Sequence, residues 1–184
     1  MKRLDVEFRH GIPSVRLSKN KKKDGQEEKM DVTRLQQIRE EQRGKKIGVI
    51  FSCFDLLHAG HCLILEEGKR NCDYFVVGLQ TDPTVDRPTK NKPIQSVEER
   101  LIQVRNQKSV DEVVLYTTEA ELVQFLEALR PDIRITGDDY VGKEFTGKDF
   151  PGVQIIYHQR SVHDYSTTRL RQRIYEAETF RLKK

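Results

Sequence analysis

Apolar and polar residues alternate along this chain in blocks of two kinds. Short, dense apolar runs such as IGVIF (47–51) and YFVVGL (74–79) are typical of buried strands. Between these runs lie longer segments whose apolar residues recur at helical spacing. The pattern predicts strands at 46–52, 74–80, 112–117, 132–136 and 153–158, and helices at 59–71, 97–107, 119–129 and 167–179.

Strands that alternate with helices of this length indicate right-handed crossovers. The sequence therefore predicts a Rossmann-like α/β fold, with a five-stranded parallel sheet and helices on both faces. Ser96 and Glu99 form a capping box that starts one of the helices. Two polar loops, 81–95 and 137–151, interrupt the alternation. No GxGxxG and no GxxxxGK[ST] follows the first strand, which excludes an NAD fingerprint and a Walker P-loop.

The segment before residue 46 follows a different pattern. Residues 31–43 predict a helix, because Asp31 can cap it and apolar residues follow at helical spacing. Residues 1–30 show no sustained apolar pattern and contain the charge run KNKKK (19–23). We therefore expect a basic N-terminal arm with a short helix at 1–45, followed by one domain at 46–184.

Charge separates the same two parts of the chain. The 184 residues carry a net charge of +4, with 34% charged and 36% hydrophobic residues. Residues 1–46 hold a net +6 and the remainder a net −2. A slightly acidic domain makes nucleic acid an unlikely partner. The basic arm leaves contact with an anionic membrane open, although such runs more often form a solvated tail.

Composition also bears on location. No apolar run approaches the roughly 20 residues that span a bilayer. The opening MKRLDVEFRH has no apolar segment of the kind found in secretory signals. The three cysteines form no paired framework, so we expect reduced thiols in a cytoplasmic protein.

The most distinctive chemistry follows the first strand of the domain, in SCFDLLHAGH (52–61). His58 and His61 stand three residues apart at the opening of a predicted helix, which places both imidazoles on one side of its first turn. Free N–H groups and the positive dipole end of that helix favour a polyphosphate. A structural histidine pair is one alternative, and zinc bound with Cys53 and Cys62 is another. Cys62 directly follows His61, however, so four ligands would not converge.

The segment SCFDLLHAGH resembles the [GS]-x-[FY]-D-x-x-H-x-G-H signature of the cytidylyltransferase family of HxGH nucleotidyltransferases. SVDEV (109–113) and GDDYVGK (137–143) resemble segments of glycerol-3-phosphate cytidylyltransferase, in the same order. Arg160 followed by Ser-Thr-Thr (166–168) resembles the last signature of that enzyme. The resemblance covers about residues 46–175.

The resemblance implies an enzyme that joins CTP to a phosphomonoester and releases pyrophosphate. It implies a catalytic set of His58, His61, Lys90 and Arg160, in which the histidines donate to phosphate oxygens and Lys90 bridges the nucleotide and acceptor phosphates. Mg²⁺ is expected as the complex of the triphosphate, with no protein ligand to the metal assigned. A homodimer is expected from segment 109–113. The implied nucleotide-binding residues are Ser52, Cys53, Phe54, Asp55, Lys92, Gly137, Asp138, Ser166, Thr167 and Thr168.

Three departures from the family pattern bear on activity. Ser52 stands where the signature usually has Gly, which the loop tolerates if the φ angle is negative or the side chain turns away. The segment between Arg160 and Ser166 is one residue longer, lacks a glycine and contains Asp164. Lys108 replaces an arginine and loses its bidentate fork. A nucleotide-binding module without turnover is therefore an alternative.

The substrates stay open at this stage. GDDY followed by GK favours CTP and glycerol 3-phosphate. Phosphoethanolamine and phosphocholine are alternative acceptors. An adenylyltransferase that uses ATP on a sugar phosphate or a flavin is another alternative, because the same histidine pair serves both nucleotides.

Overall fold

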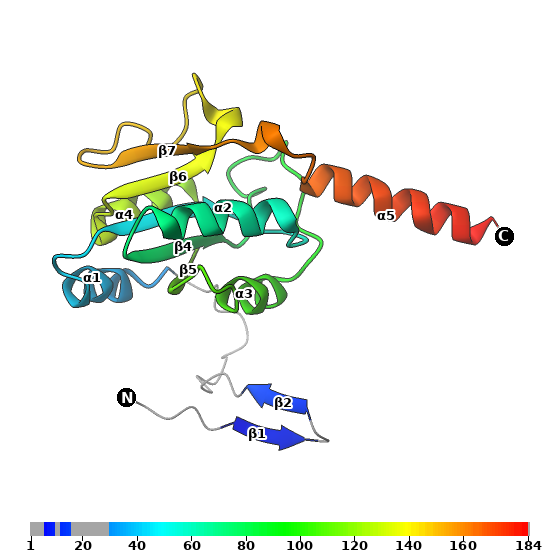
Figure 1. The fold of residues 1–184 in the computed structure, drawn as a ribbon, viewed down its shortest axis with the longest axis horizontal. Helices are drawn as coiled ribbons and strands as arrows, with labels where there is room; N and C mark the ends of the chain where they lie inside the picture. Colours follow the sequence, from blue (N-terminus) through cyan, green and yellow to red (C-terminus); the bar gives the residue numbers. More distant parts are fainter. Residues whose placement is uncertain (1–5, 10–11, 16–29, 184) are drawn as a thin grey trace.

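The computed structural model describes residues 6–9, 12–15 and 30–183. Five strands form one fully parallel sheet in the order β5-β4-β3-β6-β7, which confirms the predicted Rossmann-like α/β architecture (Figure 1). The strands are β3 (Ile47–Ser52), β4 (Tyr74–Gln80), β5 (Glu112–Tyr116), β6 (Ile133–Gly137) and β7 (Gln154–His158). Each lies within two residues of its predicted bounds.

Helices cover both faces of the sheet. On one face α1 (Val32–Glu41) and α4 (Glu119–Leu129) pack over a cluster that includes Leu35, Ile38 and Phe125, all fully buried. On the other face α2 (Ala59–Arg70) and α3 (Val97–Arg105) pack over Phe75 and its neighbours. The helix expected within the basic arm is thus part of the core.

Local sequence signals explain several boundaries. Asp31 accepts from the backbone N–H of Arg34 and starts α1. Ser96 and Glu99 form the predicted capping box at α3, and Thr118 with Glu121 forms a second one at α4. These caps satisfy N–H groups that the first helical turn leaves without partners.

The last helix, α5 (Thr167–Leu182), extends three residues beyond the prediction and projects away from the sheet (Figure 1). It has no buried residue. Its first turns lie against the rest of the domain, through contacts of Thr167 and Arg171 described below. Of the helices in the described ranges, none is long and apolar enough to cross a membrane.

Two strands near the N-terminus were not predicted. β1 (Val6–Arg9) and β2 (Ile12–Val15) pair in antiparallel register as a separate two-stranded sheet. Four residues per strand are too few for periodicity to separate a strand from a coil. The charge run at 19–23 and the rest of the predicted arm up to residue 29 lie outside the described residues.

Candidate active site

A cavity of about 670 Å³ opens at the carboxyl ends of the strands. Its walls come from the β3–α2 loop, the loop after β4, the loop after β6, and the segment from the end of β7 into α5. In open parallel sheets this edge collects the loops that bind ligands. The structure therefore places the candidate chemistry where the topology favours it.

The β3–α2 loop bends sharply to reach the helix. Phe54 and Leu56 have positive φ angles of 47° and 50°, which side chains other than glycine rarely adopt. Phe54 is buried in the core, and the Leu56 N–H donates to Gln95 Oε1 over 2.7 Å. Ser52 is not among the positive-φ residues of the described chain, and its hydroxyl accepts from the Phe54 N–H. The loop thus tolerates serine at that position.

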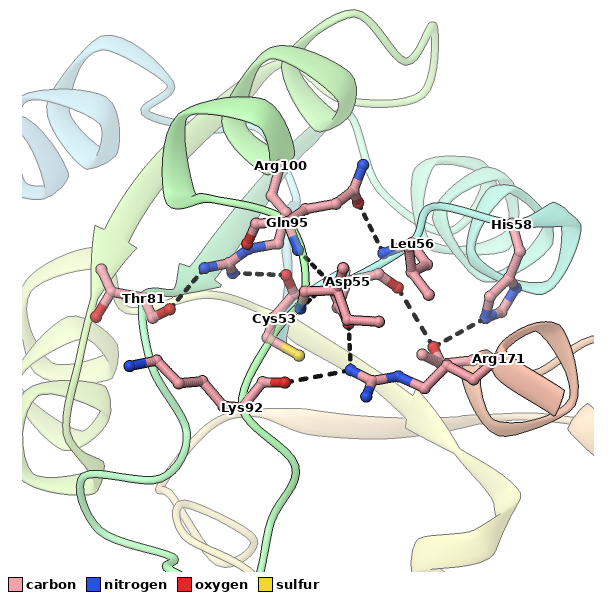
Figure 2. Close-up of polar contacts among 11 residues, drawn as sticks. Cys53, Asp55, Leu56, His58, Thr81, Lys92, Gln95, Arg100 and Arg171 are labelled. Carbon is pink, nitrogen blue, oxygen red and sulfur yellow. Dashed lines mark hydrogen bonds and ion pairs between the residues drawn. The ribbon is translucent and has the colours of Figure 1, made fainter. Parts of the chain in front are cut away.

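Asp55 lines the cavity and connects three separate segments of the chain (Figure 2). Its Oδ1 accepts from the N–H groups of Ile94 and Gln95, each over 3.0 Å. Its Oδ2 accepts from the Arg171 guanidinium of α5 over 2.6 Å. Burial opposes the ionised form, but the Gln95 N–H and the Arg171 guanidinium hold the pKa of Asp55 below its usual range. The carboxylate is therefore an anchor already in use.

Arg100 of α3 fixes the same loops from the other side (Figure 2). It is 1% exposed. Its guanidinium donates to four backbone carbonyls over 2.6–3.2 Å, those of Cys53, Gln80, Thr81 and Gln95. We refer to Asp55, Gln95 and Arg100 together as the loop support.

The two histidines stack at the start of α2. Their ring centroids lie 3.8 Å apart with an interplanar angle of 16°. His58 is the N-cap, and its Nδ1 accepts from the His61 N–H over 3.4 Å. The His58 proton therefore resides on Nε2, which lies 3.3 Å from the Thr167 hydroxyl of α5. Both imidazoles line the cavity, as their spacing predicted.

Both imidazoles are neutral at pH 7. Burial, with His58 and Arg160 adding to it, lowers the pKa of His61 to about 3. Burial also lowers the pKa of His58, with Arg160 adding to the effect. The His61 Nδ1 atom is buried without a hydrogen-bond partner in the described chain. A neutral ring keeps one N–H, so each histidine can still donate one hydrogen bond to a phosphate oxygen.

Gly60, between the histidines, is required by the protein itself. A Cβ atom there would lie 2.8 Å from the Tyr165 carbonyl oxygen. The absent side chain lets the segment before α5 approach the first turn of α2. This contact brings the amino ends of the two helices to the same cavity.

Arg160 lies opposite, on the short 3-10 helix η2 (Arg160–Val162). It forms an ion pair of 2.9 Å with Asp139 and lines the cavity. A Cβ atom on Gly137 would lie 2.2 Å from Asp139 Oδ1 and 2.6 Å from the Arg160 side chain, so a larger residue there would displace this ion pair. Asp138 instead accepts from the N–H and hydroxyl of Ser161 and does not line the cavity.

The remaining predicted residues divide into two groups. Those that line the cavity are Ser52, Cys53, Phe54, Asp55, Lys90, Gly137, Thr167 and Thr168. Lys92 and Ser166 do not line it. The Lys92 carbonyl accepts from Arg171, and Ser166 caps α5 by accepting from the Arg169 N–H. Asp164 pairs with Arg169 over 2.8 Å and also lies outside the cavity lining, so the inserted anion does not face a ligand there.

Residues 49–173 match the family model described as cytidylyltransferase-like. The chain belongs to this family. The matched range includes all the cavity-lining segments described above and agrees with the range over which the sequence resembles nucleotidyltransferases.

Individual relatives of this cytidylyltransferase-like chain match over part of their length. The bifunctional protein HldE of Caulobacter vibrioides is 41% identical over 101 residues, which cover 53% of this chain and 20% of that protein. The HldE protein of Wolinella succinogenes is 34% identical over 138 residues, which cover 73% of this chain and 29% of that protein. The chain thus spans less than a third of the length of these curated relatives.

Solved structures give the same fold. A lipopolysaccharide core biosynthesis protein from Thermoplasma volcanium has a TM-score of 0.55 and 26% identity, covering 66% of this chain and 100% of that one. Pantothenate synthetase from Thermus thermophilus has a TM-score of 0.51 and 13% identity, covering 67% and 59%. At that identity the second likeness shows the fold alone.

Several cavity residues of this cytidylyltransferase-like domain, among them Arg87 and Asp139, were missed from the sequence, and three carried a signal in it. Arg171 holds Asp55, and its position four residues after Thr167, on the same helix face, was the available signal. His163 lines the cavity and contacts His158. Arg134 lies inside the apolar strand β6, where a charged residue between two isoleucines was the signal.

Proposed function

We propose that this chain transfers the nucleotidyl group of a nucleoside triphosphate to a phosphomonoester and releases pyrophosphate. The observation that carries the proposal is the stacked, neutral histidine pair at the start of α2, facing the start of α5 across one cavity. Helix amino ends and neutral N–H donors suit a transferring phosphoryl group.

The reaction needs positioning and charge stabilisation more than a protein nucleophile. An acceptor phosphate oxygen attacks the α-phosphorus while pyrophosphate leaves in line. His58 Nε2–H would exchange its Thr167 contact for a phosphate oxygen, and His61 would donate beside it. Lys90 and Arg160, both lining the cavity, would neutralise charge on the phosphates.

Mg²⁺ would enter with the triphosphate, whose oxygens supply ligands that the cation prefers. In the described ranges, no three His, Cys, Asp or Glu side chains are arranged to hold a metal ion. The lining carboxylates Asp55 and Asp139 already pair with arginines. The cation would therefore shield triphosphate charge and rest mainly on phosphate and water.

For the substrates, we favour a sugar phosphate with ATP. The support is the likeness to the HldE proteins and to a protein of lipopolysaccharide core biosynthesis. The cavity also reaches over both faces of the sheet edge, which leaves room for an acceptor larger than glycerol phosphate. CTP with glycerol 3-phosphate is the second candidate, supported by GDDYVGK at 137–143.

Pyrophosphate release tests the proposal. ATP, CTP, GTP and UTP would be paired with hexose 1-phosphates, glycerol 3-phosphate, phosphoethanolamine and phosphocholine in the presence of Mg²⁺. Release with ATP and a sugar phosphate is expected. Release with CTP and glycerol 3-phosphate would select the second candidate. Triphosphate binding without release from any pair would contradict the enzyme and favour a nucleotide-binding module.

A further inference from the structure

Arg134 is a buried cation with few partners. It is 6% exposed, and its guanidinium lies 4.9 Å from the ring centroids of both Phe51 and Phe145. Its Nη1 donates to the Thr146 carbonyl over 2.5 Å, and no other hydrogen bond to its side chain forms within residues 30–183. Its Nε is buried without a partner. Burial lowers the pKa of Arg134 to about 10, so it remains charged at neutral pH.

Among the basic residues that line the cavity, Arg134 is buried and has no ion-pair partner in the described chain. The four lining carboxylates each have a basic partner: Asp55 with Arg171, Glu119 with Arg87, Asp139 with Arg160, and Glu144 with Lys148. No described carboxylate pairs with Arg134. A buried charge without a counterion is costly, and such groups are normally paired. Lys90 also lines the cavity without a carboxylate partner among the described residues, but it is exposed. Arg134 is therefore a buried positive charge of the cavity wall with no ion-pair partner in the described chain, although Glu119, paired with Arg87, acts on it from a distance.

Arg134 and the histidine pair face opposite sides of the sheet. Successive strand residues alternate between faces. Ile135 packs with Ile64 and Leu65 of α2, whereas Arg134, beside it, contacts Phe51 in the layer under α4. His58 and His61 start α2. The cavity edge joins both sides, so one ligand can reach both only if it extends across the end of the sheet.

We infer that the Arg134 side of the cavity binds a second anionic group of the acceptor, a carboxylate or a phosphate remote from the phosphate that reacts. The inference rests on the proposed function and narrows its acceptor class. Arg134 would form charge-assisted hydrogen bonds through Nε and its free terminal nitrogen. The rings of Phe51 and Phe145 hold the guanidinium plane in place. An acceptor with one phosphate leaves this charge unmatched.

Matched acceptors test the inference without altering the protein. The probes are glucose 1-phosphate, glucuronic acid 1-phosphate and glucose 1,6-bisphosphate, together with glycerol 3-phosphate and 3-phosphoglycerate. We expect kcat/KM to be about tenfold or more higher for a probe with the second anion than for its parent. Comparison of glucuronic acid 1-phosphate with glucose 1,6-bisphosphate shows whether the second anionic group is preferred as a carboxylate or as a phosphate. Equal kcat/KM within each matched set would overturn the inference and leave the proposed function intact.

Variants of Arg134 test whether this residue causes the preference for acceptors with a second anion. Arg134→Gln should remove the discrimination through KM, and Arg134→Lys should keep part of it. Arg105→Gln removes one charge from an exposed position of α3 and should leave the discrimination unchanged. Weaker triphosphate binding in Arg134→Gln with discrimination intact would place the residue with the nucleotide and overturn the inference.

Absence of turnover would be a failure of the proposed function, recognised by the lack of pyrophosphate from every pair. Binding of the same probes to the protein with a non-hydrolysable triphosphate then decides the inference. Tighter binding of the doubly anionic probes to the wild type, lost in Arg134→Gln, would support it. Equal binding, or no binding of any probe, would overturn it.

Discussion

The loop support and the cavity wall both contain buried arginines, but they use them in opposite ways. Arg100 in the support donates to four carbonyls, whereas Arg134 in the wall has one hydrogen-bond partner in the described chain. The wall also holds buried nitrogens without partners on His61, Arg87 and Arg171. Buried polar groups are normally satisfied, so a group of unsatisfied ones along one cavity calls for an explanation, and a bound ligand would supply their partners. Stability and ligand binding are thus assigned to neighbouring but different residues.

Replacing Arg100 should have the largest effect and should act on stability. Arg100→Met leaves the carbonyls of Cys53, Gln80, Thr81 and Gln95 without that donor, at a cost of about 3 kcal/mol or more in the free energy of unfolding. Urea denaturation followed by circular dichroism measures it. Arg105→Met, exposed on the same helix, should stay within about 0.5 kcal/mol of the wild type. Similar losses in both variants would remove the distinction between support and surface.

Replacing His61 should have the opposite effect, with a large loss of activity and little loss of stability. His61→Ala removes a donor from the wall and should lower kcat about 100-fold or more, as loss of a transition-state donor does elsewhere. Steady-state pyrophosphate release measures this change, and urea denaturation serves as the control for folding. Turnover close to that of the wild type would show that the histidine pair does not carry the chemistry.

The pH dependence of the unfolding free energy gives a second way to distinguish His61, in the cavity wall, from the loop support. His61 has a pKa of about 3 in the folded protein, against about 6.5 when unfolded. The unfolded chain binds the extra proton between these values, so stability is lost as pH falls below about 6.5. The slope contributed is up to about 1.4 kcal/mol per pH unit. His61→Gln should flatten the curve of unfolding free energy between pH 6.5 and 4, and an unchanged curve would contradict the neutral, buried imidazole.

Replacing Thr167 should have the smallest effect on activity, because its hydroxyl makes only long contacts with His58 in the cavity wall and with Asp55 in the loop support. Its hydroxyl lies 3.3 Å from His58 Nε2 and donates to the Asp55 carbonyl over 3.4 Å. Thr167→Val keeps the shape and loses both contacts, which should lower kcat/KM about fivefold. Ser161→Ala, outside the cavity lining, serves as the comparison in the same assay. Equal kinetics of the two variants would assign no role to the hydroxyl.

Local spacing predicted the parts of the molecule that depend on near neighbours in sequence. The strand and helix order, the shared side of His58 and His61, and the cap at Ser166 all arise within one or two turns. The match to the cytidylyltransferase-like family confirms the resemblance carried by the same short segments. Periodicity and capping encode such features directly.

Features set by distant contacts were not predictable in this way. Of two adjacent aspartates, Asp139 rather than Asp138 pairs with Arg160, because the turn after Gly137 decides which carboxylate faces the cavity. The role of Arg134 depends on rings from β3 and from the loop after β6. Sequence shows the charge in the strand, but only packing shows that no carboxylate meets it.

The attachment of the loop after β4 sets how much the chain must reorganise around a bound triphosphate. Arg87 is fixed to Gln80 and Glu119, and the Lys92 carbonyl is fixed to Arg171. Only the short span 88–91, which carries Lys90, lies between these points. Since ordering one residue costs about 1–2 kcal/mol, closure over the substrate would carry an entropy cost of only a few residues. A local rearrangement of this span would then suffice for substrate exchange, without a slow movement of a large lid.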